Sequence, residues 1–145
     1  MNVRLVIDTN VVLAGLRSAT GASAALLRHV VQGRVKPLLS VALVLEIESV
    51  LSRPEQLAAT GLTLALVHDF VDELCALAEP VQIHFAWRPQ LHDAADEMVL
   101  EAAVNGQADA LVTFNLKDFL PAAQNFGAEV IAPVTALRVF DLMDR

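Results

Sequence analysis

A carboxylate placed directly behind a buried strand constrains the fold of this chain more than any other feature. In residues 5–13, LVIDTNVVL, three apolar residues precede Asp8, Thr9 and Asn10, and the apolar pattern then resumes. An unbroken apolar strand is typical of the centre of a parallel sheet that is covered on both faces. Ligand sites of such sheets lie beyond the carboxyl ends of the strands. We therefore expect Asp8 to face a functional crevice, and an ordinary turn Asp is the alternative.

Strand-like and helix-like segments alternate through most of the 145 residues. This alternation predicts an α/β fold with a mainly parallel sheet and helices on its faces. Pro37 places the second strand at a sheet edge or a strand start, and Gly33 and Gly106 each end a helix. No repeat or linker divides the chain, so residues 1–145 are expected to form one domain. The expected strands are RLVI and residues 35–40, 80–85, 108–114 and 128–133, and the expected helices are residues 11–16, 21–33, 41–52, 62–78, 93–106 and a last one from about Val134.

The composition narrows the functional class. Hydrophobic residues make up 55% of the chain, but no apolar run approaches the roughly 18 residues of a membrane span. The first residues lack the layout of a signal peptide, so we expect a soluble, cytoplasmic protein. Cys75 stands alone, which excludes an internal disulfide, and its apolar helical surroundings predict a buried packing residue. The net charge of −7 argues against a broad electrostatic grip on nucleic acid, but not against a nuclease with acids around a metal.

Acidic residues recur where a parallel sheet would bring them to Asp8. Glu46 interrupts an otherwise apolar helix, and Asp93 and Asp96 share one side of the first turn of another. Asp118 follows an apolar strand, a Thr and an Asn, which repeats the pattern around Asp8. Taken singly, each acid is explained as well by a cap, a turn or a surface position.

Together these acids predict a chemistry. Clustered carboxylates raise each other's pKa unless a cation neutralises them. Oxygen ligands without cysteine indicate Mg²⁺ or Mn²⁺. Such ions activate water and stabilise a phosphoryl group during displacement, so a metal-dependent phosphodiesterase is one hypothesis. The four histidines have no His-x-x-x-His spacing, which argues against a zinc hydrolase.

The chain resembles the PIN-domain family, and within it the VapC-like toxin components of bacterial toxin–antitoxin pairs. The segments that carry the resemblance are LVIDTNVVLAGL, LLSVALVLEIESVL, LHDAADEMVLEAAVNGQADALVTFNLKDF and VIAPVTALRVF. The resemblance implies a three-layer α/β/α sandwich around the sheet. It also implies a Mg²⁺- or Mn²⁺-dependent endoribonuclease that needs no protein nucleophile.

The resemblance also implies roles for individual residues. Asp8, Glu46 and Asp96 match the first three metal-site acids, and Asp93 matches an auxiliary acid. Thr9 and Asn10 are expected to support Asp8 through hydroxyl and amide hydrogen bonds, and Ser40 to cap a helix or to touch the substrate.

The fourth acid departs from the commoner family pattern. Many PIN domains have an Asp shortly after the VT strand, where this chain has Phe114 and Asn115. Toxin-like members often show Thr-x-Asn-x-x-Asp-Phe, which Thr113 to Phe119 reproduces. We therefore predict that Asp118 is the fourth metal ligand, directly or through water, with Asn115 orienting it or the substrate and Thr113 in a supporting position.

The resemblance implies partners as well: an RNA substrate, a small antitoxin protein and a second copy in a homodimer, but no membrane. Arg17, Arg88 and Lys117 are the basic residues nearest the acids in sequence and are candidates for phosphate contacts, with plain surface charge as the alternative. Trp87 is a candidate for stacking on a base or for covering the core, and His92 for tuning the acids.

Three other functions compete with an active nuclease. An aspartyl-nucleophile phosphatase needs a second Asp where this chain has Asn10, and a receiver domain needs adjacent acids after its first strand. A degenerate PIN fold that only binds its ligand is kept open by Asn115. The presence of all four acids favours the nuclease.

Overall fold

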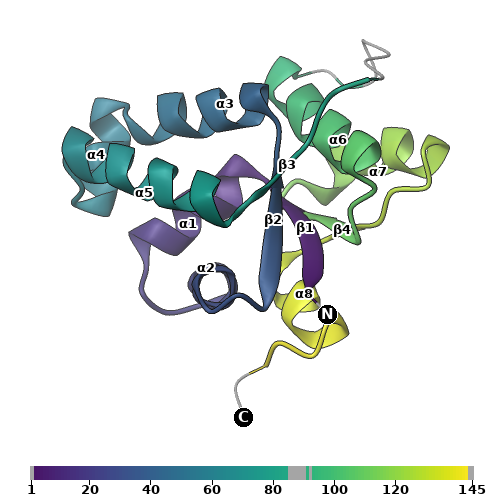
Figure 1. Cartoon of the computed structure of the whole chain (residues 1–145), viewed down its shortest axis with the longest axis horizontal. Coiled ribbons are helices and arrows are strands. Elements are labelled where there is room, and N and C mark those ends of the chain that lie inside the picture. The colour runs from purple at the N-terminus through teal and green to yellow at the C-terminus, as the bar shows by residue number, and fades with distance from the viewer. Residues whose placement is uncertain (1, 85–90, 92, 144–145) are drawn as a thin grey trace.

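The expected α/β architecture is confirmed. The computed structural model describes residues 2–84, 91 and 93–143, and this part of the chain forms one five-stranded, all-parallel sheet with eight helices (Figure 1). The strand order is β3-β2-β1-β4-β5, so β1 is central. The strands are β1 (Val3–Ile7), β2 (Val35–Leu39), β3 (Glu79–Pro80), β4 (Ala110–Val112) and β5 (Val130–Ile131).

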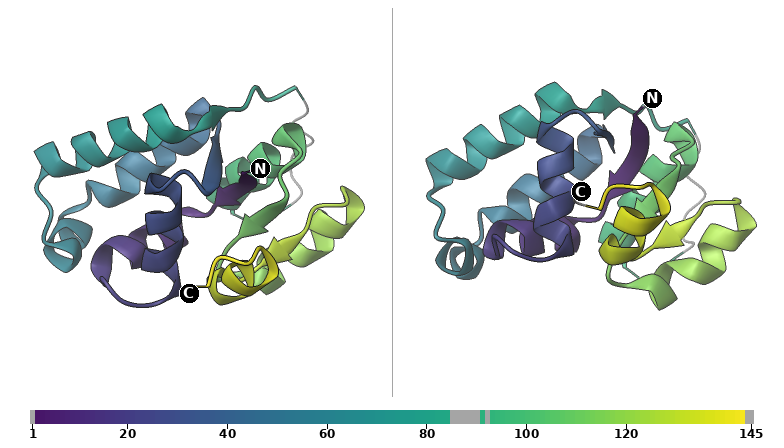
Figure 2. Two further views of the ribbon diagram at one scale, coloured as in Figure 1. Left: turned by 60° about the horizontal axis from the view of Figure 1, so that its bottom comes forward. Right: turned by 90° about the horizontal axis from the view of Figure 1, so that it is seen from below.

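Helices connect every pair of consecutive strands, as parallel pairing requires. The crossover helices α2 and α6 lie on opposite sides of the sheet, which gives the α/β/α layering (Figure 1). α4 and α7 lie at opposite ends of the molecule in all three views (Figures 1 and 2). The helices are α1 (Thr9–Arg17), α2 (Ala22–Val31), α3 (Val41–Leu51), α4 (Pro54–Thr60), α5 (Leu64–Leu77), α6 (Ala94–Gly106), α7 (Leu116–Asn125) and α8 (Pro133–Val139). None of the helices in the described residues is both long and apolar enough to cross a membrane.

The core is centred on β1 and β4, as their apolar sequences predict. Leu5 and Val6 of β1 and Leu111 and Val112 of β4 have no exposed surface. α6 packs against β1, β2 and β4. Burial of both faces of these strands supplies most of the driving force for folding and fixes the strand register.

The topology creates a crevice between β1 and β4. From β1 the chain moves outward through β2 to β3, and then returns to the other side of β1 for β4 and β5. At such a switch point the connections leave the sheet in opposite directions, which opens a site at the carboxyl ends. Asp8 lies at this point, and its backbone N–H donates to the Val112 carbonyl over 2.9 Å.

An arginine holds the opposite, amino-terminal edge together. The Arg4 guanidinium donates through Nε to Glu79 Oε1 (3.1 Å) and through its other nitrogens to the carbonyls of Gly106 (2.8 Å) and Gln107 (3.0 Å). Its backbone N–H donates to Asp109 Oδ2 over 2.8 Å. One residue of β1 therefore fixes both β3 and the end of α6, the helix that carries Asp93 and Asp96 at its beginning.

The prediction that Pro37 lies at an edge or a strand start is wrong. Pro37 is the third residue of β2, pairs in register with Leu5, and β2 lies between β1 and β3. The short β3 pairs only with Leu38 and Leu39. The part of β2 that holds Pro37 therefore has a neighbour on one side only, so a residue without an N–H donor is tolerated there.

Other elements differ from their expected bounds. The strand expected at 80–85 is reduced to Glu79–Pro80, since residues 81–84 have no regular structure and Phe85 lies outside the described residues. Helices α4 and α7 were not expected. Pro121 lies inside α7 and breaks its apolar pattern, whereas Pro54 begins α4, where its missing N–H costs nothing.

Two phenylalanines close to Asp118 in sequence contribute differently to the stability of the fold. Phe119 of α7 is completely buried, whereas Phe114 is 53% exposed. Phe119→Ala is expected to lower the free energy of unfolding by about 3–5 kcal/mol, because it leaves a cavity in the core. Phe114→Ala should change it by less than about 0.5 kcal/mol. Urea unfolding of both variants checks this, and a large loss for Phe114→Ala would contradict the described packing.

Candidate active site at the carboxyl edge of the sheet

Asp8 is the most firmly held of the candidate acids. It is 5% exposed and occupies the N-cap position of α1 with an extended backbone. Its carbonyl accepts from the N–H groups of Val11 (2.9 Å) and Val12 (3.2 Å). Its Oδ2 accepts from the hydroxyl of Thr113 over 2.7 Å. Backbone and side chain are thus both fixed at the switch point.

Thr113 links the two central strands. Its side chain is completely buried; its hydroxyl donates to Asp8 and accepts from the backbone N–H of Asn115 over 2.9 Å. Its backbone N–H donates to the Ile131 carbonyl over 3.0 Å. The loop from β4 to α7 is therefore tied to Asp8 by a single hydroxyl group, and a supporting position for Thr113 agrees with the expectation.

The predicted support of Asp8 by the Thr9 hydroxyl is wrong. Thr9 Oγ1 is buried and has no hydrogen-bond partner among the described residues, and the same holds for Asn10 Oδ1. Both residues lie in the first turn of α1, where the helix fixes their side chains. The hydroxyl that reaches Asp8 comes from β4, 105 residues along the chain.

The beginning of α6 supplies two acids. Asp93 is the N-cap, and its Oδ1 accepts from the Ala95 N–H over 2.9 Å. Asp96 lies in the first turn and is half-buried. The alternative roles of these residues, a helix cap and a first-turn acid, are therefore both present, and the charge of Asp93 also acts on Asp8 and on Asp96.

The charges of several predicted acids act on one another. Burial raises the pKa of Asp8, hydrogen bonds from the Thr113 side chain and the Thr9 backbone lower it, and the charges of Asp93 and Glu46 raise it. The pKa of Asp96 rises to about 6, first through burial and then through the charges of Asp8, Asp93 and Asp118. The acids that interact in this way come from four separate segments: Asp8, Glu46, Asp93 with Asp96, and Asp118.

Asp118 and Asn115 flank the crevice on the α7 side. Asp118 is exposed in the first turn of α7, and its backbone N–H donates to the Asn115 carbonyl over 3.0 Å. Asn115 is the N-cap, but its side chain makes no capping hydrogen bond. The charge of Asp118 contributes to the raised pKa of Asp96, after burial and the charges of Asp8 and Asp93.

Ser40 caps a helix, which is one of the two roles expected for it. It is almost completely buried, and its hydroxyl accepts from the Leu43 N–H over 3.1 Å. The cap begins α3 immediately after β2, and one and a half turns later α3 carries the half-buried Glu46.

Sequence reasoning missed one buried acid beside the cluster. Glu97, next to Asp96 on α6, is 4% exposed, and its Oε1 accepts from the backbone N–H of Leu91 over 2.7 Å. Glu97 therefore anchors the chain just before α6. An acid in a first helical turn looks like a surface residue in sequence, so only its burial distinguishes it from its neighbours.

The donor set fits a hard divalent cation in its chemistry. Carboxylates that repel one another and the buried, unpartnered Thr9 Oγ1 are oxygen donors of the type that Mg²⁺ and Mn²⁺ bind. Within the residues that the structure describes, no group of three or more His, Cys, Asp or Glu side chains is already arranged to hold a metal ion. Metal binding would therefore draw these side chains together.

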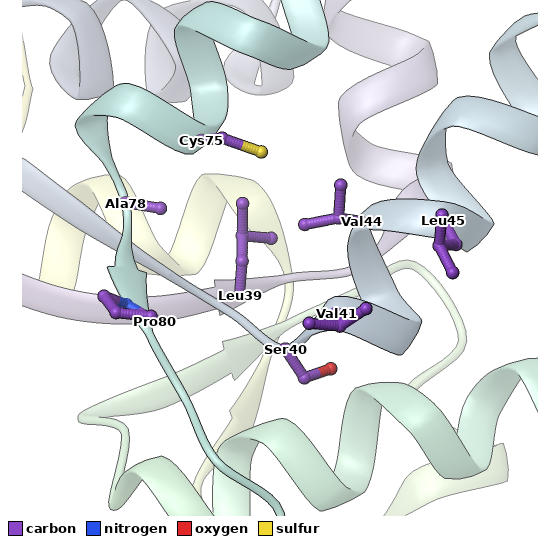
Figure 3. Close-up of a pocket in the computed structure, with 8 residues that line it drawn as sticks. All are labelled: Leu39, Ser40, Val41, Val44, Leu45, Cys75, Ala78 and Pro80. Atoms are coloured by element: carbon purple, nitrogen blue, oxygen red, sulfur yellow. The ribbon is translucent and has the colours of Figure 1, made fainter.

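An apolar pocket of about 310 Å³ lies on the β2 side of the acids (Figure 3). We call it the Cys75 pocket; its lining includes Leu39, Val41, Val44, Leu45, Cys75 and Pro80. The prediction that Cys75 is a buried packing residue is wrong, because Cys75 is exposed in α5. The buried side of α5 is formed by Val67, Val71 and Leu74, and Cys75 lies next to it along the helix. Burial, together with the charges of Asp72 and Glu48, raises the pKa of its thiol.

Residues 4–117 match the family model of the PIN domain. The chain belongs to the PIN-domain family. This fold is a nuclease-like one, and PIN domains are generally nucleases, often metal-dependent ribonucleases, that typically bind divalent metals. The match ends one residue before Asp118, so it does not include the fourth candidate acid. No curated protein matches the chain.

The five residues that are candidates for contacting RNA or for tuning the acids divide into two groups. Arg17 and Lys117 are exposed, at the end of α1 and in the first turn of α7. Arg88 and His92 lie outside the described residues, as does Trp87.

The repulsion at Asp96 gives a prediction for the metal-free PIN domain. Because its pKa is about 6 in the folded state and 3.8 in the reference state, the folded protein holds a proton that the unfolded chain releases. The stabilisation is therefore complete below about pH 4 and is lost as the pH rises through 6. In EDTA at pH 7, Asp96→Asn should raise the free energy of unfolding by about 1 kcal/mol, a value reduced for the half-exposed side chain.

The measurement is urea unfolding between pH 4 and pH 8. The gain in the free energy of unfolding of Asp96→Asn should become smaller toward pH 4. Glu55→Gln is the matched control, since Glu55 is also a first-turn acid, in α4, and its removal should bring no gain. If Asp96→Asn were no more stable than the parent at pH 7, the acids would not repel one another as described.

Proposed function

We propose that this PIN domain is a metal-dependent endoribonuclease that hydrolyses RNA phosphodiester bonds. The observation that carries the proposal is the presence, in a PIN domain, of interacting acids from four segments: burial first, and then the charges of neighbouring acids, raise the pKa of Asp8 and Asp96 at the switch point. A protein gains nothing in stability from such an arrangement, whereas a cation site requires it.

The residues of this chain have distinct roles in the proposal. Asp8, Glu46, Asp96 and Asp118 would hold Mg²⁺ or Mn²⁺. When bound, the cation supplies positive charge for the scissile phosphate and makes water a stronger acid. Thr113 keeps Asp8 in place through its 2.7 Å hydrogen bond. One of the acids accepts the proton of the attacking water, so no protein nucleophile is needed.

The remaining candidate residues act around the proposed metal site. Asp93 adds negative charge while it caps α6. Asn115 is exposed beside Asp118 and is free to orient it or the substrate. Arg17 and Lys117 supply the positive charge for phosphates that the acids repel.

Cleavage of a mixed RNA pool tests the nuclease. The purified protein is expected to cut RNA with Mg²⁺ or Mn²⁺ and not with EDTA. Asp8→Asn, Glu46→Gln and Asp118→Asn should each reduce the rate by at least about a hundredfold, because several kcal/mol of charge stabilisation are lost with the metal. Glu48→Gln, two positions from Glu46 on α3, is the matched control and should retain activity.

Activity that survives in Asp8→Asn would come from a contaminant and would remove the support for a nuclease. A protein that does not cut RNA under any of these conditions would instead be a degenerate PIN fold that only binds its ligand. Loss of activity in every variant except Asp118→Asn would remove Asp118 from the metal site.

We also propose that the protein is the toxin of a toxin–antitoxin pair, held inactive by a small antitoxin and forming a homodimer. The apolar surface on α3 supports a protein partner: Val41 is 77% exposed and Leu45 61% exposed, and both line the Cys75 pocket. An apolar segment of the antitoxin would occupy this pocket (Figure 3), whose lining residue Leu45 directly precedes Glu46 in α3.

A toxin is expected to stop the growth of its host. Induced expression of the chain in bacteria should arrest growth and reduce total RNA integrity, whereas Asp8→Asn at the same protein level should not, because the arrest depends on RNA cleavage. Growth curves and RNA gels measure both effects. Normal growth with active, soluble enzyme in the cell would contradict the toxin role while leaving the nuclease in place.

A further inference from the structure

We infer that Phe114 and the pocket beside it bind a nucleobase of the RNA strand, next to the phosphodiester that lies at the acids. The inference rests on the proposed nuclease function and adds a site for the substrate outside the acid cluster. Three observations carry it: the exposure of Phe114, the walls of the pocket, and the basic residues close to the pocket in sequence.

Phe114 is an aromatic residue that the fold does not need. It is 53% exposed, although Phe119, five residues later, is completely buried. It directly follows Thr113, whose hydroxyl is hydrogen bonded to Asp8. The ring therefore leaves the backbone next to the acid cluster. An exposed aromatic face beside a phosphate site is suited to stacking on a base, and such stacking tolerates any sequence.

A pocket of about 470 Å³ adjoins this ring. We call it the Phe114 pocket; its lining includes Ser18, Thr20, Ser23, Phe114, Ala132 and Val134. The lining comes from the ends of α1, β4 and β5 and the beginnings of α2 and α8, so the pocket opens at the same edge of the sheet as the acids. Its volume is within the range of about 300–1,000 Å³ of small-ligand sites.

The chemistry of the walls matches a nucleobase. Most of the lining is apolar, as the flat faces of a base require. Ser18, Thr20 and Ser23 are the only polar residues of the lining within the described part of the chain, and the Ser18 hydroxyl already donates to the Thr20 carbonyl over 3.0 Å. Few polar groups in a mostly apolar cavity are typical of sites that fix the orientation of a ligand.

Basic residues lie close to this pocket in sequence. No lining residue of the Phe114 pocket is charged. The exposed Arg17 directly precedes Ser18, and the exposed Lys117 lies three residues after Phe114. On a chain of net charge −7, these two cations are suited to contact the phosphates of an RNA strand whose base lies in the pocket.

The test is direct binding of a short, fluorescein-labelled, single-stranded RNA, measured by fluorescence anisotropy with Mg²⁺. All variants carry Asp8→Asn, so that the RNA stays intact; an Asn still accepts the hydrogen bond from Thr113. Phe114→Ala should weaken binding by roughly tenfold, the effect of one lost base–aromatic stack. Phe114→Tyr should bind as the parent does.

A matched pair on α8 tests the pocket itself. Val134 and Val139 are both exposed, at 52% and 62%, but only Val134 lines the Phe114 pocket. Val134→Glu should weaken RNA binding several-fold more than Val139→Glu, although both add the same charge to the same helix. Equal effects of the pair would overturn the site.

Other results of these experiments also test the inference. Unchanged RNA affinity in Phe114→Ala overturns the inference. If that variant instead dissociates a homodimer in sedimentation velocity while RNA affinity is unchanged, Phe114 belongs to a contact between copies. The nuclease is judged separately: Phe114-dependent binding by a protein that cuts no RNA in the parent form keeps the base site and removes the catalysis.

Discussion

The hydrogen bond from Thr113 to Asp8 is the interaction on which the site depends. It joins the carboxyl ends of β1 and β4, the two strands that flank the switch point, through groups that are both buried. Its donor also accepts from the Asn115 N–H, so the same hydroxyl positions the loop that leads to Asp118. Without this bond, burial alone would raise the pKa of Asp8 further and weaken it as a ligand at neutral pH.

The acids are held together by the scaffold against their own repulsion. Burial and the charges of Asp8, Asp93 and Asp118 together raise the pKa of Asp96 to about 6, so the ionised form of Asp96 is disfavoured where the fold holds it. The opposing stabilisation comes from the doubly covered sheet and from Arg4, which clamps β3 and the end of α6 at the far edge. Stability and chemistry are thus located at opposite ends of the strands, as in other parallel sheets.

Much of this arrangement could be predicted from sequence because it follows from local patterns. The buried strand before Asp8, the capping role of Ser40 and the helix that Gly106 ends all depend on neighbouring residues. The features that could not be predicted from sequence depend on contacts between residues that are far apart in the chain. The hydroxyl that binds Asp8 belongs to Thr113 and not to Thr9, because β4 returns beside β1, and Cys75 is exposed because other residues form the buried side of α5.

The uneven distribution of charge resolves an apparent conflict between a net charge of −7 and an RNA substrate. Electrostatic attraction over a broad surface is needed only when binding must be strong without local contacts. Here the acids would be neutralised by the cation that they bind, and Arg17 and Lys117 are exposed close to the Phe114 pocket in sequence. The lining of the Cys75 pocket is also uncharged, but it includes the exposed Val41 and Leu45 of α3, which suit an apolar protein segment. An exposed aromatic ring with basic residues near it therefore favours RNA on one side of the acids, and exposed aliphatic side chains favour a protein partner on the other.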